Sequence, residues 1–123
     1  MKNIYRKTQL GRKGEELASR YLEARGMHIL NRNWHYRQKE IDIVAENERY
    51  LIIVEVKTRS GGYLEAPGGM IPIKKQRFLA EAAEAYVDHY NIGKEVRFDV
   101  VIILFANNQH TLEHIPDAFL PGY

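Results

Sequence analysis

Two acidic residues and a lysine stand in segments that are otherwise strongly apolar. Asp42 lies between Ile41 and Ile43, while Glu55 and Lys57 belong to a run of isoleucine and valine. Because side chains alternate between the faces of a strand, Glu55 and Lys57 should share one face. Two carboxylates suit Mg²⁺ or Mn²⁺, which acidifies bound water, and a nearby lysine can stabilise charge on a phosphate oxygen.

Whether Asp42 joins this pair depends on how two predicted strands, residues 40–45 and 50–58, are aligned. A hairpin loop of two or four residues would put Asp42 opposite Ile53 and on the face of Glu55. A slip of one residue would turn Asp42 to the other face. The predicted metal site is therefore also a prediction of strand register.

Plainer interpretations of these acids exist. Glu55 and Lys57 also fit an ordinary ion pair on an exposed strand, although their apolar neighbours argue against exposure. A further acid, Glu15, stands at the edge of the apolar stripe of a predicted helix and can face inward. A helix-edge glutamate that binds an arginine has the same pattern.

Basic residues are concentrated towards the N-terminus. Residues 1–40 hold ten Lys and Arg against four Asp and Glu, although the chain has a net charge of only +2. Basic surfaces bind polyanions by releasing counterions, and a solvated helix face is the alternative. A lysine at a helix start, such as Lys75, is best tolerated near an anion, although a plain exposed start is as good an explanation. The candidate nucleic-acid-binding residues are Arg12, Lys13, Lys74, Lys75 and Gln76.

Apolar periodicity predicts an α/β fold with a mixed central sheet flanked by helices. The segment 59–72 is rich in glycine and proline and is expected to be a loop that borders the site. We expect one domain over residues 1–123, with residues 1–10 as a flexible tail. The predicted helices are residues 11–25 and 72–93, and the predicted strands are residues 29–36, 40–45, 50–58, 96–105 and 111–115.

The composition excludes several classes of protein. There is no cysteine, which removes disulfides and thiol catalysis, and the five histidines show no HExxH spacing. Glycine-rich nucleotide loops and a nucleophile elbow are absent. The sequence has no secretory signal and no apolar run long enough to cross a membrane, so we expect a cytoplasmic protein with no membrane partner.

Seven motifs carry a family resemblance: GRKGEELASRYLEARGM (residues 11–27), NRNW (31–34), EIDIVA (40–45), IVEVKTR (53–59), KKQRFLAEAAEAY (74–86), RFDVV (97–101) and HIPDAF (114–119). Together they resemble the YraN family of uncharacterised bacterial proteins. That family is similar to Holliday junction resolvases in the PD-(D/E)XK nuclease superfamily. The resemblance covers nearly the whole chain.

The resemblance implies a restriction-endonuclease-like single domain that cleaves DNA, branched or duplex and including repair or recombination intermediates, with Mg²⁺ or Mn²⁺. The superfamily's helix acid corresponds to Glu15, its aspartate to Asp42, and its ExK pair to Glu55 and Lys57. These acids and the Val56 carbonyl would hold the metal, and Lys57 would assist the attacking water.

The resemblance has one departure and leaves several properties open. Lys39 replaces a glycine that is usual in the family. Resolvases of this fold act as dimers, which suggests a homodimer. The alternative functions are a non-catalytic nucleic-acid-binding or repair-accessory module and an RNA-directed role.

Overall fold

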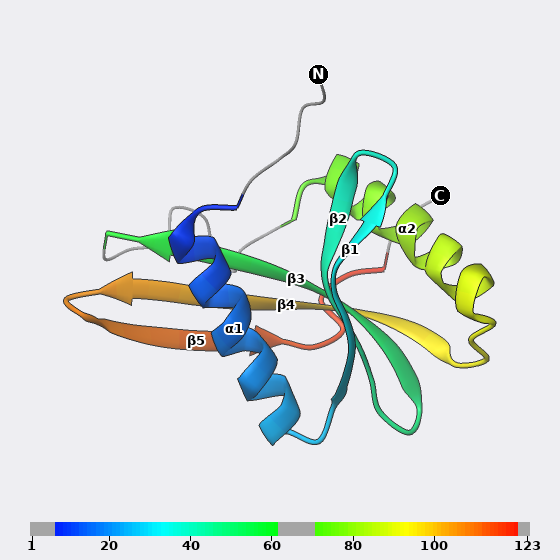
Figure 1. The fold of residues 1–123 in the computed structure, drawn as a ribbon, viewed down its shortest axis with the longest axis horizontal. Coiled ribbons are helices and arrows are strands. Elements are labelled where there is room, and N and C mark those ends of the chain that lie inside the picture. Colours follow the sequence, from blue (N-terminus) through cyan, green and yellow to red (C-terminus); the bar gives the residue numbers. More distant parts are fainter. Residues whose placement is uncertain (1–6, 62–70, 121–123) are drawn as a thin grey trace.

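A five-stranded mixed sheet with two helices forms the fold (Figure 1). The structure, a computed structural model, describes residues 7–61 and 71–120. This architecture confirms the predicted α/β fold class and is consistent with one small restriction-endonuclease-like domain. The elements in chain order are α1 (Gln9–Ala24), β1 (His28–Tyr36), β2 (Lys39–Glu46), β3 (Tyr50–Ser60), α2 (Ile73–Tyr90), β4 (Glu95–Ala106) and β5 (Gln109–Ile115).

The strands lie in the order β1-β2-β3-β4-β5. Only β3 and β4 pair in parallel; the other three pairs are antiparallel. A parallel pair needs a long connection, and α2 lies within the one between β3 and β4. The centres of these two strands are buried, which explains their nearly continuous isoleucine and valine runs.

Each helix packs on a different face of the sheet. Leu22 of α1 belongs to a core with Ile52 and other side chains of alternate positions along β2 and β3. Leu79 of α2 belongs to a second core with Ile53. Because Ile52 and Ile53 are adjacent in one strand, their side chains point to opposite faces. The middle of β3 is therefore covered on both sides, and groups from both helices can approach its end.

Helix α1 begins two residues earlier than the sequence predicted. Thr8 is its N-cap, and the Thr8 hydroxyl accepts a hydrogen bond of 2.9 Å from the backbone N–H of Gly11. Residues 7–10 are therefore part of the ordered helix start, whereas the rest of the predicted tail lies outside the described residues. The same is true of residues 62–70, most of the loop expected to border the site.

The predicted register of the β2–β3 hairpin was wrong by two residues. Ile53 pairs with Val44, not with Asp42, and the pairing ends one residue before Asp42. A shift of two residues preserves the alternation of faces. Continued by one position, the observed register would bring Asp42 opposite Glu55, so the two acids still belong to one end of the hairpin.

The side chain of Asn47 explains this shift. Its Oδ1 accepts hydrogen bonds from the backbone N–H groups of Arg49 and Tyr50, at 2.9 and 2.7 Å. The Asn47 N–H donates to the Tyr50 carbonyl at 3.0 Å. These bonds place the turn over Asn47 to Tyr50, one residue beyond the predicted four-residue loop, and leave Glu46 to pair with Leu51.

Candidate metal and nucleic-acid site

Asp42 lies where β2 and β3 stop pairing. Its Oδ2 accepts a hydrogen bond of 2.8 Å from the backbone N–H of Val56, and its Oδ1 accepts one of 2.9 Å from the Lys7 ammonium. The residue is buried. The carboxylate thus takes the place of a strand partner for Val56 and has a fixed orientation.

Lys7 joins Asp42 to the helix acid Glu15. The Lys7 Nζ lies 2.6 Å from the Glu15 carboxylate and 2.9 Å from that of Asp42. Burial opposes the charge of Lys7, but its two acidic neighbours outweigh burial and raise its pKa. Burial also raises the pKa of Glu15, with a further contribution from Asp42 that Lys7 opposes. A single ammonium thus lies between two buried acids from different elements and offsets part of their negative charge.

A close contact between α1 and β3 positions Glu15. A Cβ atom on Gly14 would clash with the Oγ1 of Thr58 and lie 3.4 Å from its Cβ. Glycine therefore lets the helix approach the strand more closely than any other residue would. As a consequence Glu15, the next residue, lies near the C-terminal part of β3.

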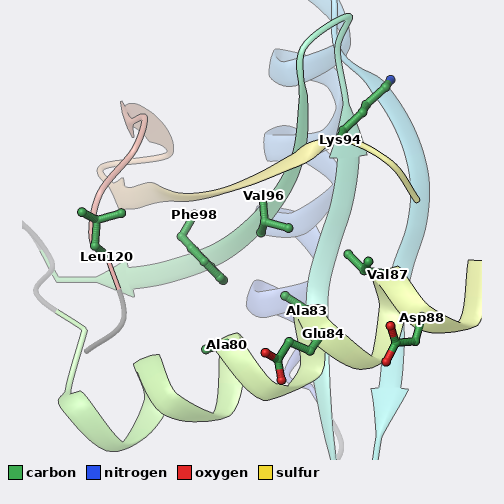
Figure 2. Close-up of a pocket in the computed structure, with 9 residues that line it drawn as sticks. All are labelled: Ala80, Ala83, Glu84, Val87, Asp88, Lys94, Val96, Phe98 and Leu120. Carbon is green, nitrogen blue, oxygen red and sulfur yellow. The ribbon is translucent and has the colours of Figure 1, made fainter. Parts of the chain in front are cut away.

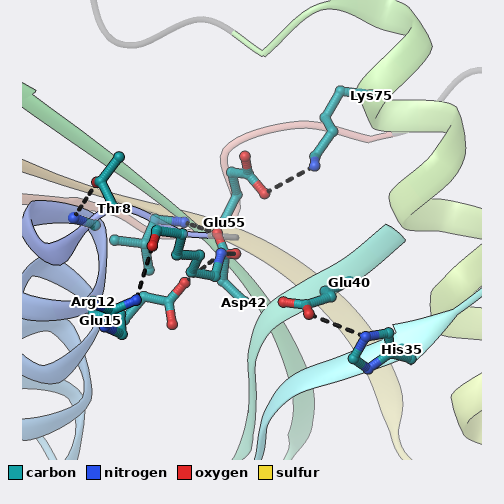
Figure 3. A network of polar contacts seen from close by, with 11 residues as sticks. Thr8, Arg12, Glu15, His35, Glu40, Asp42, Glu55 and Lys75 are labelled. Atoms are coloured by element: carbon teal, nitrogen blue, oxygen red, sulfur yellow. Dashed lines mark hydrogen bonds and ion pairs between the residues drawn. The ribbon is translucent and has the colours of Figure 1, made fainter. Parts of the chain in front are cut away.

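Glu55 is the least satisfied of the three acids. Its Oε1 is buried and accepts no hydrogen bond from the part of the chain that the structure describes. The Lys75 Nζ lies 3.7 Å away, beyond hydrogen-bonding distance (Figure 3). Burial raises the pKa of Glu55 to about 7, Asp42 adds to the shift, and the charges of Lys75 and Lys57 oppose it.

Lys57 and Val56 extend the site along β3. By strand alternation Lys57 shares the face of Glu55, as predicted. Val56 contributes its N–H to Asp42, whereas the expected metal contact concerned its carbonyl oxygen. Over residues 7–61 and 71–120, no three His, Asp or Glu side chains converge in a way that could hold a metal. The acids are close together, but in this structure lysines occupy the spaces among them.

Comparisons with known proteins identify the family. The model of the uncharacterised protein family UPF0102 matches residues 14–103. A UPF0102 protein of Parabacteroides distasonis is 43% identical over 93% of this chain and 94% of its own length. One of Bacteroides thetaiotaomicron is 40% identical over 92% of this chain and 93% of its own. The chain belongs to the UPF0102 family. This is the YraN family that the sequence motifs resembled.

The matched region of this UPF0102 protein includes the three acids but not Lys7. Sequence reasoning also missed Lys7, which lies in the segment expected to be a tail. Its contact with Asp42 joins residues 35 positions apart. No local pattern predicts such a contact; the only available signal was a lysine just before the threonine that caps α1.

The candidate nucleic-acid-binding residues of α2 differ in role. Lys75 lies near an anion, as its position at a helix start suggested, and that anion is Glu55. Gln76 donates a hydrogen bond of 2.9 Å to the Ile71 carbonyl and so holds the chain before α2. Lys74 is exposed. Lys75 is thus the residue of this group that reaches the acids.

The two candidates on α1 also differ. Arg12 donates a hydrogen bond of 2.8 Å to the backbone carbonyl of Lys7, which helps to hold Lys7 at the acids. Lys13 lies over the ring of Phe105, with 5.6 Å between its Nζ and the ring centroid. Arg12 therefore supports the site, whereas Lys13 contacts the C-terminal end of β4, where Phe105 pairs with Ser60 of β3.

A pocket between α2 and β4 is lined by none of the candidate residues. Its apolar wall includes Val96 and Phe98, and Glu84 and Asp88 contribute acidic groups (Figure 2).

Neither described helix is long and apolar enough to cross a membrane.

Proposed function

We propose that this UPF0102 protein is a metal-dependent endonuclease that cleaves phosphodiester bonds in DNA. The observation that supports this most is the Lys7 ammonium between Glu15 and Asp42, with Glu55 on the neighbouring strand close enough for the charge of Asp42 to raise its pKa. A fold gains little stability by burying three acids at one place, because each loses its hydration. Such groupings are typical of sites that bind cations or shift pKa values for catalysis.

The residues fit a divalent cation. The Lys7 ammonium already lies between Glu15 and Asp42, and the Oε1 of Glu55, which accepts no hydrogen bond from the described residues, would supply a further oxygen. Oxygen ligands of this kind suit Mg²⁺ or Mn²⁺. Asp42, Glu55, Glu15 and the Val56 carbonyl would hold the ion, which when bound supplies an acidified water. Lys7 must leave the space between the acids for this to happen.

The lysines supply positive charge on the substrate side. In hydrolysis a water oxygen attacks phosphorus, one phosphorus–oxygen bond breaks, and the products are a phosphate monoester and a free hydroxyl. Lys57 would stabilise the negative charge that builds on the phosphate oxygens. Lys75, whose ammonium lies 3.7 Å from Glu55, would bind a phosphate of the substrate. The basic residues of α1 and α2 would bind the DNA backbone.

One observation favours a second function. Because Lys7 occupies the space between two acids and no three acids converge among the described residues, the chain also fits a non-catalytic nucleic-acid-binding or repair-accessory module. Such a module would bind DNA with the same basic residues. It would keep the lysine in place and need no metal.

A cleavage assay separates these functions. Labelled branched, single-stranded and duplex DNA would be incubated with the purified protein in Mg²⁺, Mn²⁺ or EDTA. We expect metal-dependent cleavage, a rate on the order of 10² to 10³ lower for Lys57→Ala, and loss of activity for Asp42→Asn. Glu113→Gln, at an exposed acid of β5, is the matched control and should retain the rate. DNA binding without cleavage in any metal would refute the nuclease and support the accessory module.

A further inference from the structure

Two aromatic side chains lie together beside the candidate site. Tyr36, at the end of β1, and Phe78, in α2, have ring centroids 6.0 Å apart and ring planes at 44°. Both are partly buried against the core under α2. Each ring is therefore anchored by its packing and retains partial exposure.

Three cations gather on these two rings. The ammonium groups of Lys39 and Lys75 lie 5.5 and 5.4 Å from the centroid of Phe78, and the Arg37 guanidinium lies 5.2 Å from that of Tyr36. Cations are attracted to ring faces, but two ammonium groups at one ring repel each other. We call Tyr36, Arg37, Lys39, Lys75 and Phe78 the aromatic-basic patch. The three positive charges of this patch repel one another, and a bound anion would reduce that repulsion.

The turn between β1 and β2 carries a strained residue at this patch. Arg37 has a φ of 60°, in the left-handed region where glycine or asparagine is favoured in a two-residue hairpin turn. The chain thus carries an arginine at a position where glycine or asparagine would adopt this backbone conformation with less strain. Strain of this kind is concentrated at functional positions, which supports a binding role for the turn.

Lys75 connects the patch to the acids. Its ammonium lies 3.7 Å from Glu55 and 5.4 Å from the Phe78 centroid, so one side-chain head group is close to both. In Figure 3, Lys75 extends from α2 towards Glu55, and the β1–β2 hairpin that carries His35 and Glu40 lies nearby. A nucleotide bound at the patch would therefore place its neighbouring phosphate near the acids.

We propose that the aromatic-basic patch binds an unpaired DNA base next to the cleavage position. A base presents its face to an aromatic ring only when it is not stacked within a duplex, and the lysines and arginine can bind the adjoining phosphates. The preferred substrate is then DNA with single-stranded or branched regions, not continuous duplex. The location of cleavage rests on the proposed nuclease function, whereas the binding of the base does not.

Binding in EDTA tests the patch without cleavage. The probes are a single-stranded oligonucleotide with 2-aminopurine, whose fluorescence is quenched by stacking, a duplex of the same length, and the matching single-stranded RNA. Tyr36→Leu and Phe78→Leu remove the ring but keep an apolar side chain for packing. Tyr90→Leu, at an exposed tyrosine near the other end of α2, is the control for the loss of an aromatic residue.

We expect each patch variant to weaken single-stranded DNA binding roughly 5- to 100-fold, with less than 3-fold change for duplex, and to abolish the quenching. Tyr90→Leu should bind like the wild type, and Tyr36→Phe should restore binding, which shows that the ring matters and not the fold. Equal losses for single strand and duplex, or no loss, would overturn the proposal. Patch-dependent binding of RNA but not of DNA would also overturn it.

The same variants keep the two proposals distinguishable. If the wild type cleaves DNA and the patch variants cleave and bind as well as it does, the patch proposal fails and the nuclease stands. If no metal supports cleavage but single-stranded binding still needs Phe78, the nuclease fails and the patch stands.

Discussion

Asp99, a buried acid, and Glu55, a partly buried acid with one buried oxygen, lie in adjacent parallel strands and differ in how well they are satisfied. Asp99 accepts two hydrogen bonds of 2.9 Å from Arg97, one of 3.0 Å from the Asp117 N–H, and contacts the His114 ring at 2.8 Å. Burial opposes its ionisation, but these partners outweigh burial and lower its pKa. Among the described residues no group donates a hydrogen bond to the Glu55 Oε1, the Lys75 ammonium lies 3.7 Å away, and burial raises the pKa of Glu55 to about 7.

This difference separates a structural acid from a candidate functional one. The partners of Asp99 come from β4, β5 and the segment after β5, so its carboxylate ties three parts of the chain together and has no capacity left for a ligand. Glu55 differs, because its buried Oε1 can accept hydrogen bonds but receives none from the described residues. A buried acid that the fold leaves unsatisfied is better explained by a ligand than by stability.

The largest expected difference is in stability. Asp99→Ala should lower the free energy of unfolding by about 3 to 5 kcal/mol, because it leaves Arg97 partly buried without its anion. Glu55→Gln should change stability by less than about 1 kcal/mol near pH 4.5, where the folded protein holds this carboxyl protonated, and should increase stability near pH 7, where it removes a poorly solvated charge. Urea denaturation in EDTA measures both. A loss for Glu55→Gln as large as that for Asp99→Ala would remove the distinction between the two acids.

The two acids should also respond to pH with opposite signs. The folded protein binds the Glu55 proton more tightly than the unfolded chain, so this group's stabilisation is complete below pH 4.5 and is lost as the pH rises to about 7. Between these limits the wild type should lose about 3 kcal/mol relative to Glu55→Gln. Asp99, with a lowered pKa, contributes stability that is present near neutrality and lost as the pH falls.

The measurement is a set of unfolding curves from pH 4 to 8 for the wild type and Glu55→Gln in EDTA. A stability difference that does not change with pH would show that Glu55 has an ordinary pKa. Protonation of Asp99 destabilises both proteins at the acidic end of this pH range. The difference in stability between the two proteins is therefore more informative than either curve alone.

Local patterns explain why most of the fold was predictable. The strands were predicted from β-branched and apolar runs and from alternation, and all five are present in the structure. The register of Asp42 was not predictable, because it depends on the side chain of Asn47 in the turn. The alternation nevertheless kept Asp42 at the end of the hairpin near Glu55, since an error of two residues leaves the faces unchanged.

Contacts between distant segments were beyond the sequence. The contact of His114 with Asp99 requires the β4–β5 pairing, and the raised pKa of Glu55 requires burial that only the packed fold provides. The position of Lys7 depends on the cap at Thr8 and on Gly14, which brings α1 against β3. These features depend on tertiary packing, so they could not be predicted from composition or from the spacing of residues.

The smallest expected effect tests whether Lys7 occupies a cation site. Lys7→Met removes the ammonium and leaves Glu15 and Asp42 facing each other, so the variant should be less stable than the wild type in EDTA. A divalent cation that binds only the folded state would restore that loss, because stabilisation grows with RT ln(1 + [Mg²⁺]/Kd). We expect 10 mM Mg²⁺ to raise the Tm of Lys7→Met by about 4 °C more than that of the wild type. Lys94→Met, which removes a lysine from an ion pair with Glu46 instead, is the matched control and should respond to Mg²⁺ like the wild type. Equal Mg²⁺ responses for Lys7→Met and Lys94→Met would mean that the lysine neutralises the acids as part of the fold alone, and Glu15 and Asp42 would then belong with Asp99 as structural acids.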